Sequence, residues 1–197
     1  MADAGLVRSA LAHLGDVGSL RLDGTDVRLT EQPHTGKVIL RGDPTDPQFL
    51  GAVRGALELD LPLAPNTSSE TPPVSALWLG PDEWMLICAP GSQDAVAESL
   101  RVALEGQHAA VVDVSDARTV FQLFGLSSRE VLAKGCALDL HPSAFGFGDV
   151  AQTLVAKASV ILHQTADESD EGGPSFDIYV ARSFADYLWC WFQDAIN

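Results

Sequence analysis

Basic residues are scarce in this sequence: 12 lysines and arginines stand against 27 aspartates and glutamates, and the formal net charge is −15. The bases are scattered singly along the chain, whereas binding to nucleic acid or to an anionic membrane requires clustered bases that neutralise phosphates. This shortage predicts that neither nucleic acid nor a membrane is a partner. The acidity itself indicates either simple solubility or a basic partner surface.

Cysteines and long apolar runs are also few. The three cysteines, Cys88, Cys136 and Cys190, lie far apart in apolar stretches, which is typical of structural thiols in a reducing compartment rather than of a disulfide framework. The first residues lack the apolar core of a signal peptide. No apolar run approaches the roughly 18 residues that span a bilayer. We therefore expect a soluble, cytoplasmic protein.

Motifs for catalysis and cofactor binding are missing as well. The glycines form neither a dinucleotide-binding GxGxxG nor a phosphate-binding loop, and no GxSxG nucleophile motif occurs. The histidines lack the paired spacing of zinc ligands, although folding could bring His141 near His163. The sequence therefore predicts no catalytic, no cofactor-binding and no metal-binding residue in this chain.

Residues 1–36 differ in pattern from the rest. Apolar and polar residues alternate from Ser19 to Glu31 on both sides of Asp23-Gly24, a dipeptide that favours tight hairpin turns. We predict an arm with a hairpin that lies along the main domain or reaches onto a partner.

Strand signals recur through residues 37–197. Short apolar runs are bounded by turn residues such as Pro81-Asp82. The predicted strands cover 38–41, 75–80, 83–89, 119–125, 151–155, 160–164 and 175–180. The polar stretch 65–73 and the acidic stretch 167–173 are predicted loops.

Helix signals fall between these strands. Asp46 is a predicted N-cap before Pro47, which suits the first helical position, and Ser92 and Ser183 are predicted N-caps of later helices. Ser127 and Glu130 form a predicted capping box, in which each side chain bonds the backbone of the other residue.

The order strand-helix-strand-strand-helix thus occurs twice, and the segment 57–62 resembles 137–142 at the same place in both copies. Such units place helices on one face of an antiparallel sheet. We predict an α+β fold of two pseudo-symmetric β-α-β-β-α units. An arm at 1–36 precedes one duplicated domain at 37–197, with halves at about 37–106 and 109–197.

The last helix is unusually aromatic. Phe184, Tyr187, Leu188 and Trp191 follow one helical stripe, and Trp189 and Phe192 point away from part of it. A deeply buried terminal helix explains this pattern, and so does a helix that places spare aromatics in an interface. For the second alternative, the candidate subunit interface is Trp189, Phe192 and Tyr187.

Several segments carry a family resemblance. The segments 112–115, 125–139 and 151–155 resemble the folate-binding domain of the glycine-cleavage aminomethyltransferase superfamily. More specifically, the chain resembles the γ-subunit family of heterotetrameric sarcosine oxidase. The matching segments are 38–43, 61–66, 77–84, 132–142 and 179–189.

The resemblance implies a non-catalytic structural subunit of an oxidoreductase complex. Such a complex converts sarcosine, O₂ and tetrahydrofolate to glycine, H₂O₂ and 5,10-methylenetetrahydrofolate. The implied partners are the α, β and δ subunits, which carry FAD, a covalent FMN, NAD and zinc, whereas the γ subunit carries no cofactor. Another N-methyl amino acid remains an alternative substrate, because the substrate pocket belongs to another chain.

The chain departs from the folate enzymes at one place. In those enzymes a Gly-Gly turn and acidic residues follow the Gln-Thr-Leu strand, and the stretch 155–163 here contains neither. Folate binding is therefore not carried over. The alternative function is a free-standing folate-dependent aminomethyltransferase-like enzyme or a folate-binding protein, and it predicts tight binding of tetrahydrofolate by the isolated chain.

Overall fold

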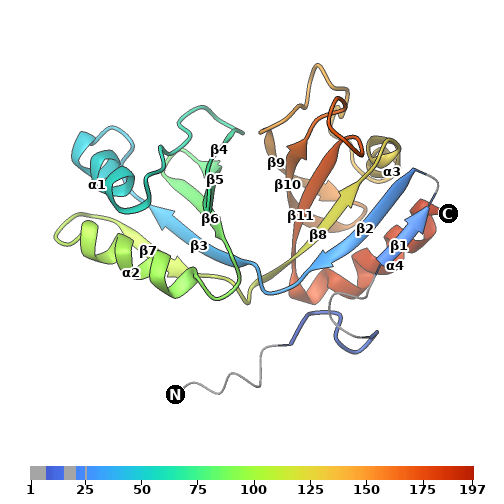
Figure 1. Cartoon of the computed structure of the whole chain (residues 1–197), viewed down its shortest axis with the longest axis horizontal. Helices are drawn as coiled ribbons and strands as arrows, with labels where there is room; N and C mark the ends of the chain where they lie inside the picture. Colours follow the sequence, from blue (N-terminus) through green and yellow to red (C-terminus); the bar gives the residue numbers. More distant parts are fainter. Residues whose placement is uncertain (1–7, 16–20, 25) are drawn as a thin grey trace. The chain divides into compact units, whose positions relative to one another are not determined.

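A computed structural model describes residues 8–15, 21–24 and 26–197 of the 197-residue chain. The chain divides into two compact units, each built on one sheet (Figure 1). The described residues of the five-stranded unit are 35–115 and 148–151, and the described remainder forms the six-stranded unit. None of the described helices is long and apolar enough to cross a membrane.

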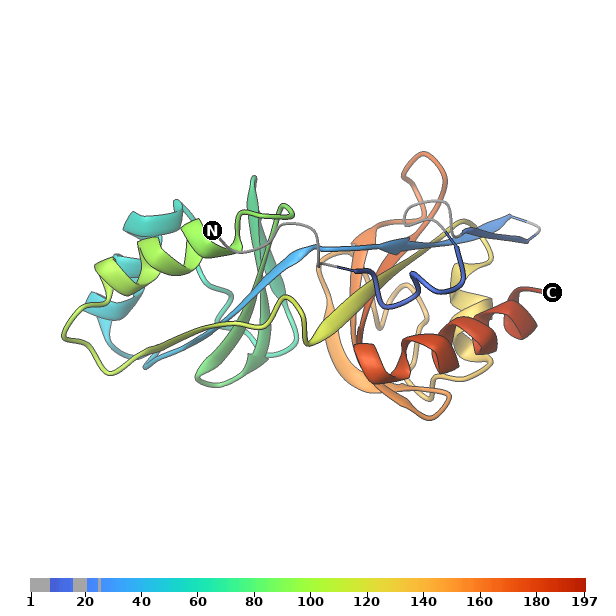
Figure 2. The same ribbon diagram turned by 90° about the horizontal axis from the view of Figure 1, so that it is seen from below.

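The five-stranded unit packs two helices on one face of its sheet (Figure 2). Its strands are β3 (Gly36–Arg41), β4 (Ser68–Thr71), β5 (Val74–Gly80), β6 (Glu83–Cys88) and β7 (Ala110–Asp113), and its helices are α1 (Pro47–Leu57) and α2 (Gln93–Ala103). The strand order is β4-β5-β6-β3-β7. Apolar side chains from both helices and from the central strands form the core, in which the rings of Phe49 and Trp84 pack at a tilt with 6.0 Å between their centroids.

Local signals set the ends of these elements. Asp46 caps α1, since its carboxylate accepts from the Gln48 amide at 2.8 Å, and Pro47 occupies the first turn as predicted. Pro81-Asp82 joins β5 to β6, which also confirms the prediction. Ser92 occupies the N-cap of α2, but its hydroxyl makes no capping hydrogen bond to any described residue.

The prediction of a continuous loop at 65–73 is wrong, because β4 lies within it. This strand is at the edge of the sheet and is half exposed, so it lacks the apolar alternation from which strands are predicted.

The six-stranded unit repeats this plan. Its strands are β1 (Arg21–Gly24), β2 (Val27–Gln32), β8 (Arg118–Phe124), β9 (Val150–Val155), β10 (Ala158–Ala166) and β11 (Ser175–Ala181), although the first two residues of β9 are counted with the five-stranded unit. Its helices are α3 (Ser128–Ala133), the short 3-10 turn Arg182–Phe184 and α4 (Ala185–Ile196). The strand order is β1-β2-β8-β11-β10-β9. The predicted β9, β10 and β11 are thereby confirmed.

Three local predictions in this unit need correction. The hairpin turn follows Gly24, because Gly24 pairs with Val27 and the positive φ of 57° falls on Asp26. The predicted capping box is wrong: Ser127 makes no side-chain cap to a described residue, and its own amide donates to the Asp26 carbonyl. The last helix starts at Ala185, so Phe184 rather than Ser183 is its N-cap residue.

Both units follow the order β-α-β-β-β-α, with equivalent strand orders β4-β5-β6-β3 and β9-β10-β11-β8. This confirms the α+β class and the repeat, with one more strand in each copy than the predicted order. The strand that precedes each copy pairs in the other sheet: β2 pairs with β8, and β7 pairs with β3. The division into an arm at 1–36 and a duplicated domain at 37–197 stays a prediction.

Candidate functional site

The N-cap and the outer face of α4 present two aromatic side chains to solvent. Phe184 is 43% exposed and Tyr187 is 38% exposed, and their rings meet edge to face at 6.3 Å between centroids. The opposite face of α4 is buried, with Leu188, Trp189 and Phe192 at most 3% exposed. The helix therefore combines an apolar inner face with a partly aromatic outer face.

The three predicted interface residues therefore fall into a buried pair and one exposed residue. Trp189 packs on Phe121 at 5.7 Å between ring centroids, and Phe192 is fully buried. These two side chains are core residues and are unavailable to a partner in this fold, because the helix turns them towards the sheet. Tyr187 is exposed and stays a predicted interface residue.

Residues 8–15, which we call the arm from here on, lie beside α4. Leu11 is fully buried, whereas Leu14, one turn further on, is 46% exposed. The His13 ring lies 3.0 Å from the Asp186 carboxylate of α4. Exposed apolar and aromatic side chains are therefore gathered on this side of the six-stranded unit. We call His13, Leu14, Phe184, Asp186 and Tyr187 the α4–arm patch.

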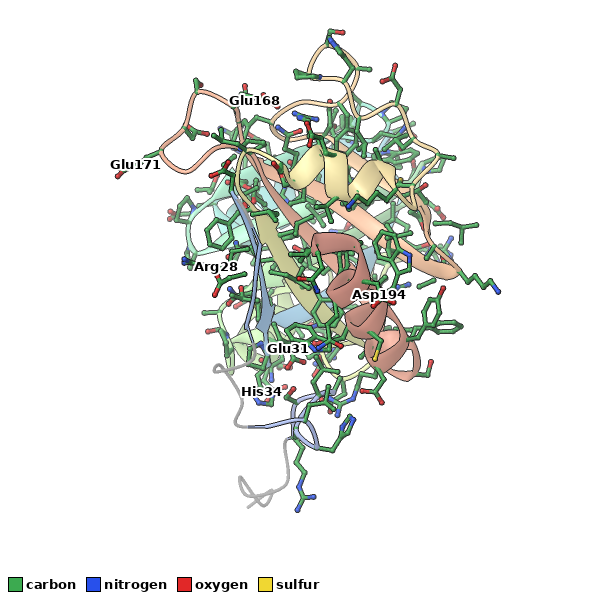
Figure 3. The ribbon with its side chains drawn as sticks, turned by 90° about the vertical axis from the view of Figure 1, so that its right-hand side faces the viewer. Arg28, Glu31, His34, Glu168, Glu171 and Asp194 are labelled. Atoms are coloured by element: carbon green, nitrogen blue, oxygen red, sulfur yellow. The ribbon has the colours of Figure 1, made fainter. Side chains whose placement is uncertain are left out.

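A buried carboxylate anchors the arm. Glu31 on β2 is 3% exposed and accepts hydrogen bonds from the Ser9 hydroxyl and, at 2.8 Å, from the Thr119 hydroxyl. The Ser9 oxygen also accepts from the Leu11 amide at 3.0 Å, which shapes the turn. Figure 3 shows Glu31 on the sheet just above this segment. A carboxylate satisfied in this way fixes the arm directionally, as apolar contact alone does not.

The arm has a second attachment. The Arg182 guanidinium donates to the Arg8 carbonyl at 2.8 Å. Arg182 belongs to the 3-10 turn that leads into α4, so the start of the arm is bonded to the segment that precedes the exposed aromatics.

A nearly buried arginine organises the loops at the other end of this unit. The Arg129 side chain is 13% exposed and pairs with the Glu168 carboxylate. It also donates to the Leu140 carbonyl at 2.6 Å and to the Phe145 carbonyl at 2.9 Å, and it lies 5.3 Å from the centre of the Phe176 ring. These contacts use the guanidinium to hold two loops in place.

The histidines are dispersed in the structure. His163 on β10 is 2% exposed, and burial lowers the pKa of its imidazole to about 4, so the ring is neutral at neutral pH. His141 is exposed, where it bonds Ser143. Within the described ranges, no three His, Cys, Asp or Glu side chains are grouped as metal ligands.

The cysteines divide between core and surface. Cys88 and Cys136 are buried, and burial raises the pKa of the Cys88 thiol, as expected of a structural thiol. Cys190 is exposed on the outer face of α4, so the prediction of an apolar environment is wrong for this residue. Its flanking tryptophans suggested burial, but a helix turns adjacent residues in different directions.

Comparison with known sequences identifies relatives. The model of the sarcosine oxidase, gamma subunit family matches residues 41–197. The sarcosine oxidase subunit gamma of Corynebacterium sp. (strain P-1) is 30% identical over 96% of this chain and 90% of its own length. That of Arthrobacter sp. is 37% identical over 62% of this chain, and the match spans about half (53%) of the Arthrobacter protein.

Comparison with solved structures agrees with these matches in sequence. The chain resembles a chain of the heterotetrameric sarcosine oxidase from Corynebacterium sp. U-96 with a TM-score of 0.83, 31% identity and coverage of 96% and 94% of the two chains. Aminomethyltransferase T of the glycine cleavage system from Bartonella henselae matches with a TM-score of 0.62 over 86% of this chain and 46% of its own chain. At 18% identity, this second likeness concerns the fold alone.

Proposed function

The chain belongs to the sarcosine oxidase gamma subunit family, and we propose that it is a non-catalytic structural subunit of a heterotetrameric sarcosine oxidase in the cytoplasm. The complex would oxidise sarcosine with O₂ and pass the one-carbon unit to tetrahydrofolate. Its α, β and δ subunits would carry FAD, covalent FMN, NAD and zinc, while this chain supplies binding surfaces.

The α4–arm patch is the observation that carries this proposal. Phe184 and Tyr187 are aromatic side chains of the kind enriched in interfaces, and each is more than a third exposed. Their helix is fixed from below by Trp189 and Phe192, and the arm beside it is fixed by Glu31. A pre-positioned aromatic surface loses little side-chain freedom when a partner covers it.

The polar side chains of this unit support a structural role. Arg129 and Glu31 are fully engaged with groups of the same chain, and His163 is neutral inside the sheet. Groups that serve catalysis are instead placed in a cavity within reach of a substrate.

Omission of this chain tests the proposal. The partner subunits of the oxidase are co-expressed with and without it, and their assembly state and oxidase activity are measured. We expect the complex to be lost or fragmented without this chain. Normal assembly of an active oxidase in its absence would contradict the structural role.

The patch itself is tested by the double variant Phe184→Ala/Tyr187→Ala. Because both side chains are partly exposed, the isolated chain should keep its fold, while retention on tagged partner subunits should fall about tenfold or more, as for central aromatic contacts. The variant Val102→Ala, at a side chain that is 66% exposed on α2, is the matched control. Equal retention of the double variant and the control would rule out this surface.

The folate-binding alternative is tested by calorimetry. Tetrahydrofolate is titrated into the isolated chain, and our proposal expects no micromolar binding. Micromolar binding by this chain alone would replace the proposal with a folate-dependent function.

A further inference from the structure

A hollow of about 440 Å³ opens on the six-stranded unit, away from the α4–arm patch residues. Its lining includes Phe124, Gly125 and Leu126, which connect β8 to α3 and which we call the floor. The lining also includes Asp23 and Asp26 from the β1–β2 hairpin and Asp170 from the loop between β10 and β11, and we call these three carboxylates the rim. We call this site the hairpin hollow. Its volume is that of a pocket for a small molecule or for one or two side chains.

The floor of the hollow is preformed. The Gly125 amide donates to the Pro174 carbonyl at 3.1 Å, and the Ser127 amide donates to the Asp26 carbonyl at 3.3 Å. Gly125 has a φ of 122°, and a Cβ there would lie 2.2 Å from the Asp26 oxygen. The hairpin therefore rests directly on the glycine backbone, and the floor needs no rearrangement before a partner binds.

The floor exposes an apolar side chain. Leu126 is 69% exposed, although it comes only two residues after the end of the largely buried strand β8. Gly173, with a φ of 81°, brings the acidic loop so close that a Cβ there would lie 3.0 Å from a Leu126 methyl carbon. The loop thus contacts one side of the Leu126 side chain and leaves the rest exposed. Such an exposed apolar group favours contact with an apolar side chain from outside.

The rim is acidic. Arg28 is the basic residue of the lining, and it donates to the Asp23 carboxylate at 2.8 Å while lying 5.3 Å from the centre of the Phe124 ring. Its charge is therefore already engaged, and Asp26 and Asp170 add negative charge. Figure 3 shows Arg28 on the side of the unit where Glu171 of the acidic loop projects. The surface is complementary to a positive charge.

We propose that the hairpin hollow receives a segment of a partner subunit that presents an apolar side chain next to a lysine or arginine. The apolar side chain contacts Leu126, and the base lies among the rim carboxylates. The surplus of acidic residues in this chain fits a partner with a basic surface. This proposal rests on the proposed function, because it requires that the chain is assembled with other subunits.

Two variants separate the apolar and the electrostatic contributions. Leu126→Glu places a charge on the floor, and Asp26→Asn/Asp170→Asn removes two charges while keeping side-chain oxygens that accept hydrogen bonds. The controls are Val102→Glu, at a similarly exposed apolar residue, and Asp60→Asn, at a carboxylate far from the hollow in sequence and in the other unit. Each chain is co-expressed with the oxidase partner subunits, and its retention on a tagged partner is measured over a range of NaCl concentrations.

We expect Leu126→Glu to lower retention about tenfold, and the double asparagine variant to release the chain at lower NaCl concentrations. Both controls should behave like the unaltered chain. If the unaltered chain is itself not retained, the proposed function fails together with this inference. If the chain and both controls are retained and Leu126→Glu is retained equally, only the hairpin hollow is refuted.

Cross-linking identifies the occupant. A photoreactive benzoylphenylalanine is introduced at position 126 of the chain in the assembled complex, and the cross-linked peptide is sequenced. We expect a peptide of a partner subunit with a lysine or arginine beside an apolar residue. A peptide without a base, or one from a second copy of this chain, would overturn the proposal.

Discussion

The five-stranded and the six-stranded unit share an order of strands, but they differ in what their interiors contain. Among the described residues of the five-stranded unit, only one charged or polar side chain is buried, that of Lys37. The six-stranded unit buries Ser9, Glu31, Thr119, Ser128, His163, Gln164 and Ser175. The same topology therefore accommodates a nearly apolar core and a core with many hydrogen-bonding groups.

This difference corresponds to the surfaces that each core supports. The polar groups of the six-stranded unit hold irregular segments: Glu31 binds the arm, and Arg129 binds the loops that contain Leu140 and Glu168. Hydrogen bonds are directional and fix such segments in one position, whereas apolar packing mainly supplies stability. Both proposed docking surfaces, the α4–arm patch and the hairpin hollow, lie on the six-stranded unit.

The largest expected effect is in the apolar core. Trp84→Ala removes a fully buried ring that packs on Phe49 and whose indole nitrogen donates to the Pro62 carbonyl at 2.8 Å. We expect the free energy of unfolding to fall by about 3–5 kcal/mol, measured by urea titration with hydrogen exchange resolved by peptide. Trp84→Phe should cost less, because it keeps an aromatic ring. A loss below about 1 kcal/mol for Trp84→Ala would contradict an apolar basis for this unit.

The next effect is expected at Arg129. Arg129→Met leaves Glu168 and the carbonyls of Leu140 and Phe145 without their donor, so we expect a loss of about 3 kcal/mol. Hydrogen exchange should accelerate in the segments 138–146 and 166–173. Arg129→Lys is the control that keeps the charge but not the forked geometry. Unchanged exchange in both loops would show that packing alone holds them.

A pH effect should follow from His163. Its folded-state pKa of about 4 lies below the ordinary 6.5, so the unfolded chain binds the proton first as the pH falls. The contribution of the neutral His163 ring to the free energy of unfolding is therefore fully present above pH 6.5. It is lost as the pH falls from 6.5 to 4, and the loss is about 2 kcal/mol at pH 5. His163→Leu should flatten the urea-unfolding profile between pH 7.5 and pH 5, whereas the exposed His108→Asn should not. An unchanged pH dependence in His163→Leu would refute this account.

The smallest effect is expected at the arm. Ser9→Ala removes a donor to Glu31, and we expect the arm to open about 1 kcal/mol more easily with little change in global stability. Faster proteolytic cleavage near residues 9–14 would report this opening. Ser99→Ala, at an exposed serine of α2, is the control. Equal cleavage rates in both variants would mean that the burial of Leu11, without the Ser9–Glu31 hydrogen bond, holds the arm in place.

The local features of the fold were predictable from local chemistry. Asp46 and Pro47 determine the start of α1 through contacts within one turn of helix. Pro81-Asp82 supports the β5–β6 turn in a similarly local way. At Ser127 the same reasoning failed, because the hairpin carbonyl of Asp26, about a hundred residues away, binds its amide and replaces the local cap.

The candidate surfaces were only partly predictable. The aromatic content of α4 drew attention to the right helix, but aromatics on several sides left its orientation ambiguous, and Trp189 and Phe192 proved to be core residues. The role of Glu31 depends on partners that are 22 and 88 residues away. The role of Arg129 depends on partners that are 11, 16 and 39 residues away. Sequence spacing carries no signal of such pairs, and the hairpin hollow is likewise assembled from three distant segments.

The pairing of β2 with β8 and of β7 with β3 has a consequence for synthesis on the ribosome. All strands of the five-stranded sheet have been made once Asp113 emerges, so this sheet can close early. The β1–β2 hairpin is made before the other described strands, yet its partner β8 ends at Phe124. Until then its strand edge is unpaired, and such an edge is open to wrong association. The nascent chain thus completes the five-stranded unit before the six-stranded unit, which carries the proposed docking surfaces. A molecular chaperone would therefore be needed chiefly by the six-stranded unit.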